Sequence, residues 1–377
     1  NEFFHVPGDS SIRNVLQSDL VTTKPELFDL NPDGTRNPHY PNLSNPDAVQ
    51  MVADKVKQWF SEHPEATSYG FAPDDGMPRD YNPETLKLSV GLPEVQGRPG
   101  VAAELSVSDE WFGFVNKVIA EVHKEHPGVY ISTNGYANRD IAPITVKPDP
   151  STVVMFAAIW SCTLHGYDTE HCWQKTRQAQ MLRKWAELCP NVWIYGYNYN
   201  MLVSGLTLLP EFTKLRQDLP LLKKWGIIGF MDETRNVWME SGIGSRYLRA
   251  RLEWDTDVNV DALLDEFFSQ WYGPAAEPMK AYYYALDRAV AEGSVHGHED
   301  RCLPELYTAD LLNGMRRQVT MAKAAADSEP YATRVKAEEL IYDHLRAYMA
   351  MTDADLEGDF TEAAKQAAQM LSYRRQI

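Results

Sequence analysis

The feature that most constrains the fold is an alternation of short apolar segments with longer amphipathic ones, which runs from the N-terminus to about Trp254. Five apolar segments have the length of buried strands: 68–72, 128–132, 152–160, 191–195 and 226–231. Apolar residues recur at helical spacing in the segments that precede or separate them: 46–63, 108–125, 176–188 and 209–225. An alternation of strands and helices predicts a parallel sheet whose strands are connected by helices.

Two α/β architectures fit this pattern, an open doubly wound sheet and a closed (β/α)8 barrel. No glycine-rich phosphate-binding turn of the GxGxxG or GxxxxGK[ST] type follows any of the strands. Several strands end instead in polar or aromatic clusters, which is typical of the catalytic face of a barrel. We therefore predict an α/β fold with a (β/α)8 TIM-like barrel. Even with a sixth strand at 3–5 the count is below eight, so we expect the first strands to lie upstream of residue 1 or to be missing.

The strand pattern ends after Trp254, and the rest of the chain has the pattern of amphipathic helices. These segments are 263–271, 279–291, 309–327, 332–354 and 360–373. We therefore predict two regions. Residues 1–255 form the catalytic (β/α) barrel, incomplete at its N-terminus, and residues 256–377 form a C-terminal α-helical bundle.

The charge of the chain excludes some classes of partner. There are 36 Lys and Arg residues against 53 Asp and Glu, which gives a formal net charge of −17. Nucleic-acid binding needs clustered Lys and Arg for phosphate contacts, so no nucleic-acid partner is expected. No apolar run reaches the roughly 18 residues of a membrane span, so none is predicted.

Two adjacent carboxylates, Asp74 and Asp75, directly follow the strand at 68–72 and are followed by Gly76. Adjacent carboxylates in a partly dry cleft repel each other, so the pKa of one rises and that group stays protonated near neutral pH. A protonated carboxyl beside an ionised one is the acid–base equipment of glycoside hydrolysis. The alternative is a solvated turn, since Pro-Asp-Asp-Gly suits a turn equally well.

A second acidic pair, Asp232 and Glu233, follows the strand at 226–231, with Arg235 two residues further on. Arg235 would hold one of these carboxylates ionised. A barrel brings its strand ends to one mouth, so both acidic pairs are expected at one cleft. The alternatives are a helix N-cap and a carboxylate site for Mg²⁺ or Mn²⁺.

Aromatic and amide side chains follow the strand at 191–195, where Tyr197, Asn198 and Tyr199 are consecutive. Aromatic rings suit the C–H faces of sugars, and amide and phenol groups suit hydroxyls, although the same aromatics could be core residues. Weaker members of the predicted substrate-binding set are Asn134, Tyr136, Trp160 and His5. Asp232 and Arg235 complete this set.

The four cysteines, Cys162, Cys172, Cys189 and Cys302, form no CxxC pair. A disulfide between Cys162 and Cys172 stays open on spacing alone. His165, His171 and Cys172 match no standard metal spacing, and the segment 296–300 has the character of an exposed loop. We therefore predict no metal and no cofactor.

Several further segments make the sequence similar to a known family. They are Lys24–Leu30, Asp33–Arg36, Leu43–Pro46, Pro73–Gly76, Tyr130–Ala137, Asn198–Asn200, Arg251–Trp254 and Phe267–Ala275. In order and spacing the chain resembles the bacterial family known as domain of unknown function 4838. That family resembles glycoside hydrolases with a (β/α)8 barrel behind a small α/β domain. Some of its relatives, in glycoside hydrolase family 163, are endo-β-N-acetylglucosaminidases, similar in plan to hexosaminidases and α-glucuronidases.

The resemblance also implies roles for individual residues. If residues 3–5 are the third barrel strand, the segment 68–72 is the fourth, and Asp75 takes the place of the general acid. Asp74 would orient a substrate N-acetyl group, Tyr197 or Tyr199 could bond the same amide, and Glu233 could bind a hydroxyl or act as base. Related substrate-assisted enzymes often have Asp-Glu where this chain has Asp-Asp.

We therefore expect a glycoside hydrolase that acts on a glycan containing a β-linked N-acetylhexosamine, by substrate-assisted retention. The first alternative is a uronic-acid-specific hydrolase that uses Asp75 and Glu233, with Arg235 or Arg139 pairing the substrate carboxylate. The second is a non-catalytic carbohydrate-binding barrel. The resemblance implies a secreted, periplasmic or cell-surface location. The exact sugar, endo or exo action and the oligomeric state stay open.

Overall fold

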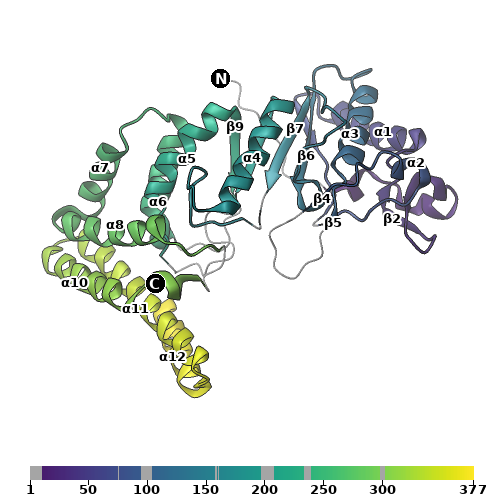
Figure 1. Cartoon of the computed structure of the whole chain (residues 1–377). Coiled ribbons are helices and arrows are strands. Elements are labelled where there is room, and N and C mark those ends of the chain that lie inside the picture. The colour runs from purple at the N-terminus through teal and green to yellow at the C-terminus, as the bar shows by residue number, and fades with distance from the viewer. Residues whose placement is uncertain are drawn as a thin grey trace. The chain divides into compact units, whose positions relative to one another are not determined.

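The structure is a computed structural model, and it describes residues 11–74, 76–94, 104–157, 159, 161–196, 208–232, 239–297 and 302–377 (Figure 1). The chain divides into two compact units. Unit 1 comprises residues 1–160, 178–196 and 225–231, and unit 2 comprises residues 161–177, 197–224 and 232–377. No helix in the described part of the chain has the length and apolar character to cross a membrane.

Unit 1 is built on a five-stranded sheet whose strands follow one another in chain order, β3-β6-β7-β8-β9. The strands are β3 (Ser68–Gly70), β6 (Tyr130–Tyr136), β7 (Thr152–Ala157), β8 (Val192–Gly196) and β9 (Ile227–Asp232). The pairs β3/β6, β6/β7 and β7/β8 are parallel. All five predicted strands are confirmed, and so is the α/β class. The described strands do not by themselves establish a closed barrel.

One face of this sheet is covered by helices α1 (Pro46–Glu62), α3 (Ser108–Val122) and α4 (Trp173–Leu188), all three of which were predicted. A tryptophan on each helix makes the contact. The ring of Trp59 lies 4.8 Å from that of Tyr69, and the Trp111 Nε1–H donates to Thr133 Oγ1 at 3.0 Å. The ring of Trp185 packs over Gly135. In each case a large apolar side chain on the helix covers the same face of the sheet.

The opposite face of the sheet carries polar and aromatic side chains, because successive residues of a strand point to opposite sides. Thr133 and Gly135 face the helices, so Asn134 and Tyr136 lie on this second face. By register, Met155 of β7 and Trp193 of β8 share it. The indole of Trp193 lies against Gly229, where a Cβ would meet the ring at 2.5 Å. Glycine at 229 is therefore what allows a large aromatic side chain to lie across β9.

Four short strands were not predicted. They form two antiparallel pairs, β1 (Phe28–Leu30) with β2 (Arg36–Pro41) and β4 (Pro93–Glu94) with β5 (Glu104–Leu105). Three have only two or three residues, too few for a periodic pattern, and β2 contains two prolines. The small elements η1 (Ile12–Val15), η2 (Ser18–Thr22), η3 (Pro25–Leu27), η4 (Ala137–Arg139) and α2 (Pro83–Leu86) complete the described part of unit 1.

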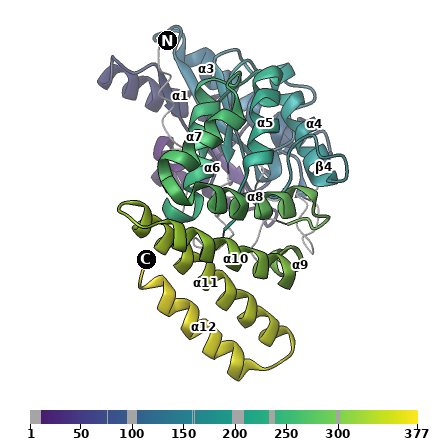
Figure 2. The ribbon, with the colours of Figure 1, turned by 90° about the vertical axis from the view of Figure 1, so that its left-hand side faces the viewer.

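Unit 2 is helical in its described residues. Its elements are α5 (Phe212–Trp225), α6 (Met239–Trp254), α7 (Val260–Tyr272), η5 (Gly273–Ala275), α8 (Ala276–Glu292), α9 (Leu303–Leu306), α10 (Ala309–Ala325), α11 (Tyr331–Leu356) and α12 (Phe360–Arg374). Helices α8, α10, α11 and α12 lie in successive layers (Figure 2). The predicted C-terminal helices are confirmed. The boundary at residue 255 stays a prediction.

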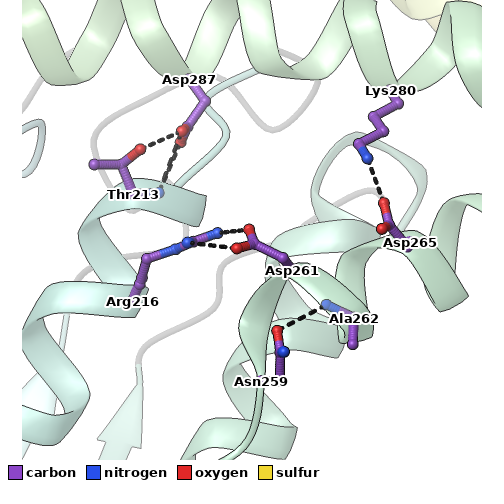
Figure 3. Close-up of polar contacts among 8 residues, drawn as sticks. All are labelled: Thr213, Arg216, Asn259, Asp261, Ala262, Asp265, Lys280 and Asp287. Atoms are coloured by element: carbon purple, nitrogen blue, oxygen red, sulfur yellow. Dashed lines mark hydrogen bonds and ion pairs between the residues drawn. The ribbon is translucent and has the colours of Figure 1, made fainter.

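Polar contacts fix α5, α7 and α8 to one another (Figure 3). The pairs are Thr213 with Asp287, Arg216 with Asp261, and Lys280 with Asp265. The carboxylate of Asp287 accepts from the Thr213 N–H at 3.2 Å and from its Oγ1–H at 2.6 Å, and so satisfies the first turn of α5 from the neighbouring helix. Asn259 caps α7 by accepting from the Ala262 N–H at 3.1 Å.

Candidate active site

The predicted site residues lie at or just beyond the carboxyl ends of three strands, of which β3 and β6 are neighbours and β9 is the edge strand opposite β3. Asp74 comes four residues after β3, Asn134 and Tyr136 belong to the last part of β6, and Asp232 is the last residue of β9. The structure describes Asp74, Asn134, Tyr136 and the backbone of Asp232. Eight further predicted residues lie outside the described residues: Asp75, Glu233, Tyr197, Asn198, Tyr199, Trp160, Arg235 and His5. Their roles stay predictions.

The segment that carries the first acidic pair is held by Arg139. Its side chain is completely buried, and its NH2 group donates to the carbonyl of Pro73 at 3.2 Å and to that of Asp74 at 3.3 Å. The Nε–H and NH2 groups both donate to Asn134 Oδ1, at 2.9 and 2.7 Å. Asn134 therefore orients the guanidinium from the sheet, and the guanidinium holds the backbone that leads into Asp75.

Two more side chains hold the same segment beyond Asp75. The Tyr40 hydroxyl donates to the carbonyl of Gly76 at 3.1 Å, and the Asn138 amide donates to the carbonyl of Met77 at 2.7 Å. Asn138 and Tyr40 are buried. The backbone on both sides of Asp75 is thus fixed by side chains from β2, β6 and η4. A catalytic group needs this kind of support, because the rate of the reaction depends on how precisely the group is positioned against the substrate.

The carboxylate of Asp74 forms an ion pair with Arg13, with an N–O distance of 2.8 Å. Both side chains are partly exposed, 37% for Asp74 and 47% for Arg13. Burial raises the pKa of the neighbouring Tyr40 phenol, and the negative charge of Asp74 raises it further. Tyr40 therefore stays a hydrogen-bond donor at neutral pH, as its contact with Gly76 requires. The Asp74 oxygens are accessible acceptors for a substrate N–H or O–H.

The residues that support this site were missed by the sequence analysis, which treated Arg139 only as a substrate-carboxylate ligand. Its guanidinium is buried and donates to protein oxygens, so Arg139 supports the loop instead. One signal in the sequence could have pointed to Asn138 and Arg139. They follow closely after the strand that ends with the predicted substrate-binding residues Asn134 and Tyr136. Nothing in the sequence marks Arg13 or Tyr40, which contact this loop from more than thirty residues away.

A buried pair of carboxyl groups, Asp29 and Asp80, was also missed. Asp80 accepts from the N–H groups of Leu30 and Asn82 at 3.2 and 2.9 Å, and from the Thr85 hydroxyl at 2.7 Å. Burial, with the charge of Asp80, raises the pKa of Asp29 to about 9. Both residues are at most 2% exposed. Asp80 therefore connects β1 to the segment 82–85, and burial leaves the pair without access for a substrate.

Two residues weighed as metal ligands do come together. His165 and Cys172 lie in unit 2 with Cys162 and His296, and their ligand atoms are all within 4.8 Å of one another. His171 contacts the rings of His165 and His296 and is not one of the four. All four cysteines are free thiols in this structure. The prediction that 296–300 is merely an exposed loop is wrong for His296, since its Nδ1 atom is buried.

The fold is that of an α/β protein whose main-sheet strands lie side by side in chain order. An acidic loop held by buried side chains lies at the carboxyl edge of this sheet. A family model for a domain of unknown function, DUF4838, matches residues 8–285, and the chain belongs to this family. The resemblance to this family that was drawn from the sequence is thereby confirmed, and the resemblance to glycoside hydrolase family 163 stays a prediction.

The other comparisons add little. A search of the curated proteins found no match. One solved structure, described as the structure of CpGH84D, aligns with 12% identity and a TM-score of 0.33. The alignment covers 87% of this chain and 53% of that one, so the chain spans about half of the solved protein. A likeness this distant supports neither a fold nor a function.

Proposed function

We propose that this protein is a glycoside hydrolase with Asp75 as its general acid. One observation carries the proposal: the backbone on both sides of Asp75 is fixed by Arg139, Tyr40 and Asn138 at the carboxyl edge of a parallel sheet. Barrel enzymes place their catalytic residues at this edge. A solvated turn, the alternative reading of Pro-Asp-Asp-Gly, needs no buried arginine beneath it.

We also propose that the sheet is part of a (β/α)8 barrel. Its strands follow one another without the reversal of order that marks a doubly wound sheet, and α1, α3 and α4 cover one face only. In a barrel the other face lines the interior, which suits Asn134, Tyr136 and Trp193. Ser11 forms a parallel bridge with Ala72, next to β3. That bridge agrees with a further segment pairing at this edge of the sheet, whereas the expected strand at 3–5 lies outside the described residues.

The reaction follows from the two adjacent carboxyl groups. Asp75 gives its proton to the glycosidic oxygen as the bond to the anomeric carbon breaks. The acetamido oxygen of the substrate attacks that carbon and forms a cyclic intermediate, which water then opens. Asp74 accepts a hydrogen bond from the acetamido N–H and so strengthens the attacking oxygen. Tyr197 or Tyr199 bonds the same amide, and Glu233 binds a hydroxyl.

The ion pair between Arg13 and Asp74 supports this division of roles. Arg13 limits the directions in which the Asp74 carboxylate can turn, and the partial exposure of Asp74 leaves an oxygen accessible. The substrate is then a glycan with a β-linked N-acetylhexosamine. We place such an enzyme outside the cytoplasm, where the family resemblance locates its relatives.

The test is hydrolysis of a panel of aryl glycosides by the protein and by Asp75→Asn. The panel contains β-N-acetylglucosaminide, β-N-acetylgalactosaminide, α- and β-glucuronide and β-glucoside. We expect turnover of an N-acetylhexosaminide and a loss of about 10²- to 10⁴-fold in Asp75→Asn. The matched control is Glu84→Gln, which removes an exposed carboxylate of the same unit and leaves the rate unchanged.

Other results would contradict specific parts of the proposal. Turnover of a uronide alone would assign the two-carboxylate mechanism of Asp75 and Glu233 and remove the acetamido role from Asp74. The same panel is repeated with an intact N-glycan, which an endo-acting enzyme requires. A protein that binds this glycan without cleaving it, and whose Asp75→Asn variant binds equally, is a carbohydrate-binding protein and not a hydrolase.

A further inference from the structure

Four side chains in unit 2 form a group that the proposed reaction does not use. Cys162, His165, Cys172 and His296 each offer one ligand atom, and these four atoms all lie within 4.8 Å of one another. The first three residues are buried and His296 is partly buried. Two thiols and two imidazoles are a common ligand set of structural zinc sites, which have four protein ligands and no open position.

The distances suit a shared metal ion. Zinc binds sulfur at about 2.3 Å and nitrogen at about 2.0–2.1 Å in a tetrahedron, which places neighbouring ligand atoms about 3.3–3.8 Å apart. His165 Nδ1 lies 3.4 Å from Cys162 Sγ. The largest separation exceeds the tetrahedral one by about an ångström, which small side-chain rotations close.

The hydrogen bond of His165 sets its ring for coordination. Its Nε2 lies 2.8 Å from the carbonyl of Gly293, so this nitrogen carries the proton and donates it. The other nitrogen, Nδ1, then has its lone pair free and directed to Cys162. A backbone carbonyl that fixes the tautomer of a histidine ligand is a regular feature of metal sites.

His296 supplies an independent observation. Its Nδ1 atom is buried and has no hydrogen-bond partner among the residues that the structure describes. A buried polar nitrogen is normally satisfied, and this one belongs to a residue whose neighbours are two thiols and another imidazole. Coordination to a metal by the imidazole accounts for a histidine in this environment.

The backbone already joins the two segments that carry the ligands. The Thr163 N–H donates to the carbonyl of Gly297 at 2.9 Å, and the Lys214 ammonium donates to the carbonyl of Thr163 at 2.7 Å. Cys172 directly precedes the first residue of α4. A metal here would fasten the segment 162–172 to residue 296, more than a hundred residues along the chain.

The charges balance as well. Two thiolates and two neutral imidazoles carry a total charge of −2, which a divalent cation cancels. Without a metal the two cysteines are neutral thiols, which can lie close together inside the protein. Binding of a divalent cation releases their protons, and the cation then compensates the two thiolate charges.

We propose that Cys162, His165, Cys172 and His296 bind one Zn²⁺ ion as a tetrahedral structural site of unit 2. The rival use of these cysteines is a disulfide between Cys162 and Cys172. A disulfide gives no role to the orientation of His165 or to the buried nitrogen of His296. The zinc proposal does not depend on the proposed hydrolase activity.

The test is the metal content of the whole chain, purified without chelator and measured by inductively coupled plasma mass spectrometry. We expect one zinc per chain, falling to near zero in Cys162→Ser and in His296→Gln. Two matched controls, Cys189→Ser and His171→Gln, keep the full content. Cys189 lies in unit 1, and His171 contacts the rings of two ligands and, through Nε2, the Gly293 carbonyl at 3.2 Å without being one of the four ligands. Zinc retained in Cys162→Ser and His296→Gln at the level of the two controls, or absent from the wild-type protein, would overturn the proposal.

A second measurement covers variants that fail to fold. Zinc is removed from the wild-type protein by a chelator and replaced with Co²⁺, and the absorption spectrum is recorded. We expect the strong visible bands of tetrahedral Co²⁺ and a thiolate-to-metal charge-transfer band. An intact mass lower by two hydrogen atoms, with no metal bound, would show the disulfide and reject the site.

Discussion

At the scale of single residues, the most informative side chain is Arg139, a fully buried cation that donates hydrogen bonds to uncharged oxygens of Asn134, Pro73 and Asp74. A guanidinium has a rigid fork of donors, and here the fork joins Asn134 to the carbonyls of Pro73 and Asp74. Lysine carries the same charge without the fork. Substitution by lysine therefore separates the effect of the charge from that of the geometry.

We expect Arg139→Lys to lower kcat by about 10- to 100-fold on whichever panel substrate the wild-type protein cleaves, because the general acid loses its fixed position. KM changes little, and the limb of the pH–rate profile that reports the acid moves. Steady-state kinetics across pH measures both effects. The control is Arg183→Lys, an exposed arginine of α4 in the same unit. Equal kinetics for Arg139→Lys and the control would reject the positioning role.

Asp29 gives a prediction about pH. Its pKa is about 9 in the folded protein against 3.8 as the reference, so the folded state keeps a proton that the unfolded state loses above pH 4. The contribution of Asp29 to the free energy of unfolding is fully present below about pH 4. It decreases as the pH rises toward 9, by up to about 1.4 kcal/mol per pH unit. Asp29→Asn mimics the protonated form and removes this slope.

Urea unfolding at several pH values between 4 and 9 measures the slope. We expect the free energy of unfolding of Asp29→Asn to exceed that of the wild-type protein increasingly as the pH rises. The exposed Asp47→Asn serves as control. Parallel pH profiles for Asp29→Asn and the wild-type protein would contradict the assignment.

At the scale of elements, Asp109 shows how one carboxylate joins a helix to a loop. It lies in the first turn of α3 and accepts from the N–H groups of Ile144, Thr145 and Val146 and from the Thr145 hydroxyl. The residue is 1% exposed. Its removal takes away the acceptor of three backbone N–H groups and one hydroxyl in a partly exposed loop, and leaves a buried gap at the start of α3.

We expect Asp109→Ala to lower the free energy of unfolding by about 2–4 kcal/mol, measured by urea denaturation. The exposed Asp47→Ala, in the first turn of α1, costs less than about 1 kcal/mol. A difference between the two variants of under half a kcal/mol would show that the loop at 144–146 is held by other contacts.

Prediction from sequence succeeded for elements long enough to show a period. The strands of the main sheet and the helices α1, α3, α4, α5, α7, α8, α10, α11 and α12 were all expected from their residues. The short strands β1, β2, β4 and β5 and the helix α6 were not, since α6 contains Gly242 and Gly244 and has little amphipathic pattern. For the site, the acidic pair and its strand end could be read from the sequence. Its support could not, because Arg13, Tyr40 and Arg139 reach it through the fold.

At the scale of the whole molecule, two buried groups, one in each unit, make stability depend on pH in opposite directions. In unit 2, burial and then the charge of Arg374 lower the pKa of His344 to about 4. The Arg374 Nε–H donates to His344 Nε2 at 3.2 Å, which requires a neutral ring. The unfolded state takes up a proton below about pH 6.5, so stability from His344 is present above that pH and is lost toward pH 4. The contribution of Asp29 in unit 1 changes in the opposite direction, because it is lost as the pH rises.

We expect His344→Gln to flatten the acid side of the stability profile and Asp29→Asn to flatten the alkaline side. Because the two residues belong to different units and share no partner, the double variant is expected to show the sum of the single effects to within about 0.5 kcal/mol. Unfolding curves of the four proteins at pH 5 and pH 8 measure this. A larger coupling energy would mean that protonation in one unit changes the other.

The contact between Arg139 and the acidic loop has a consequence for how function arises during folding. The acidic loop and Arg139 are 65 residues apart in the chain and meet when β3 pairs with β6. A chain that has not formed this pair contains every residue of the proposed acid loop and lacks its support. Recovery of catalysis during refolding is therefore expected to follow the pairing of these two strands. The rate at which catalytic activity returns would then report the rate at which β3 and β6 pair.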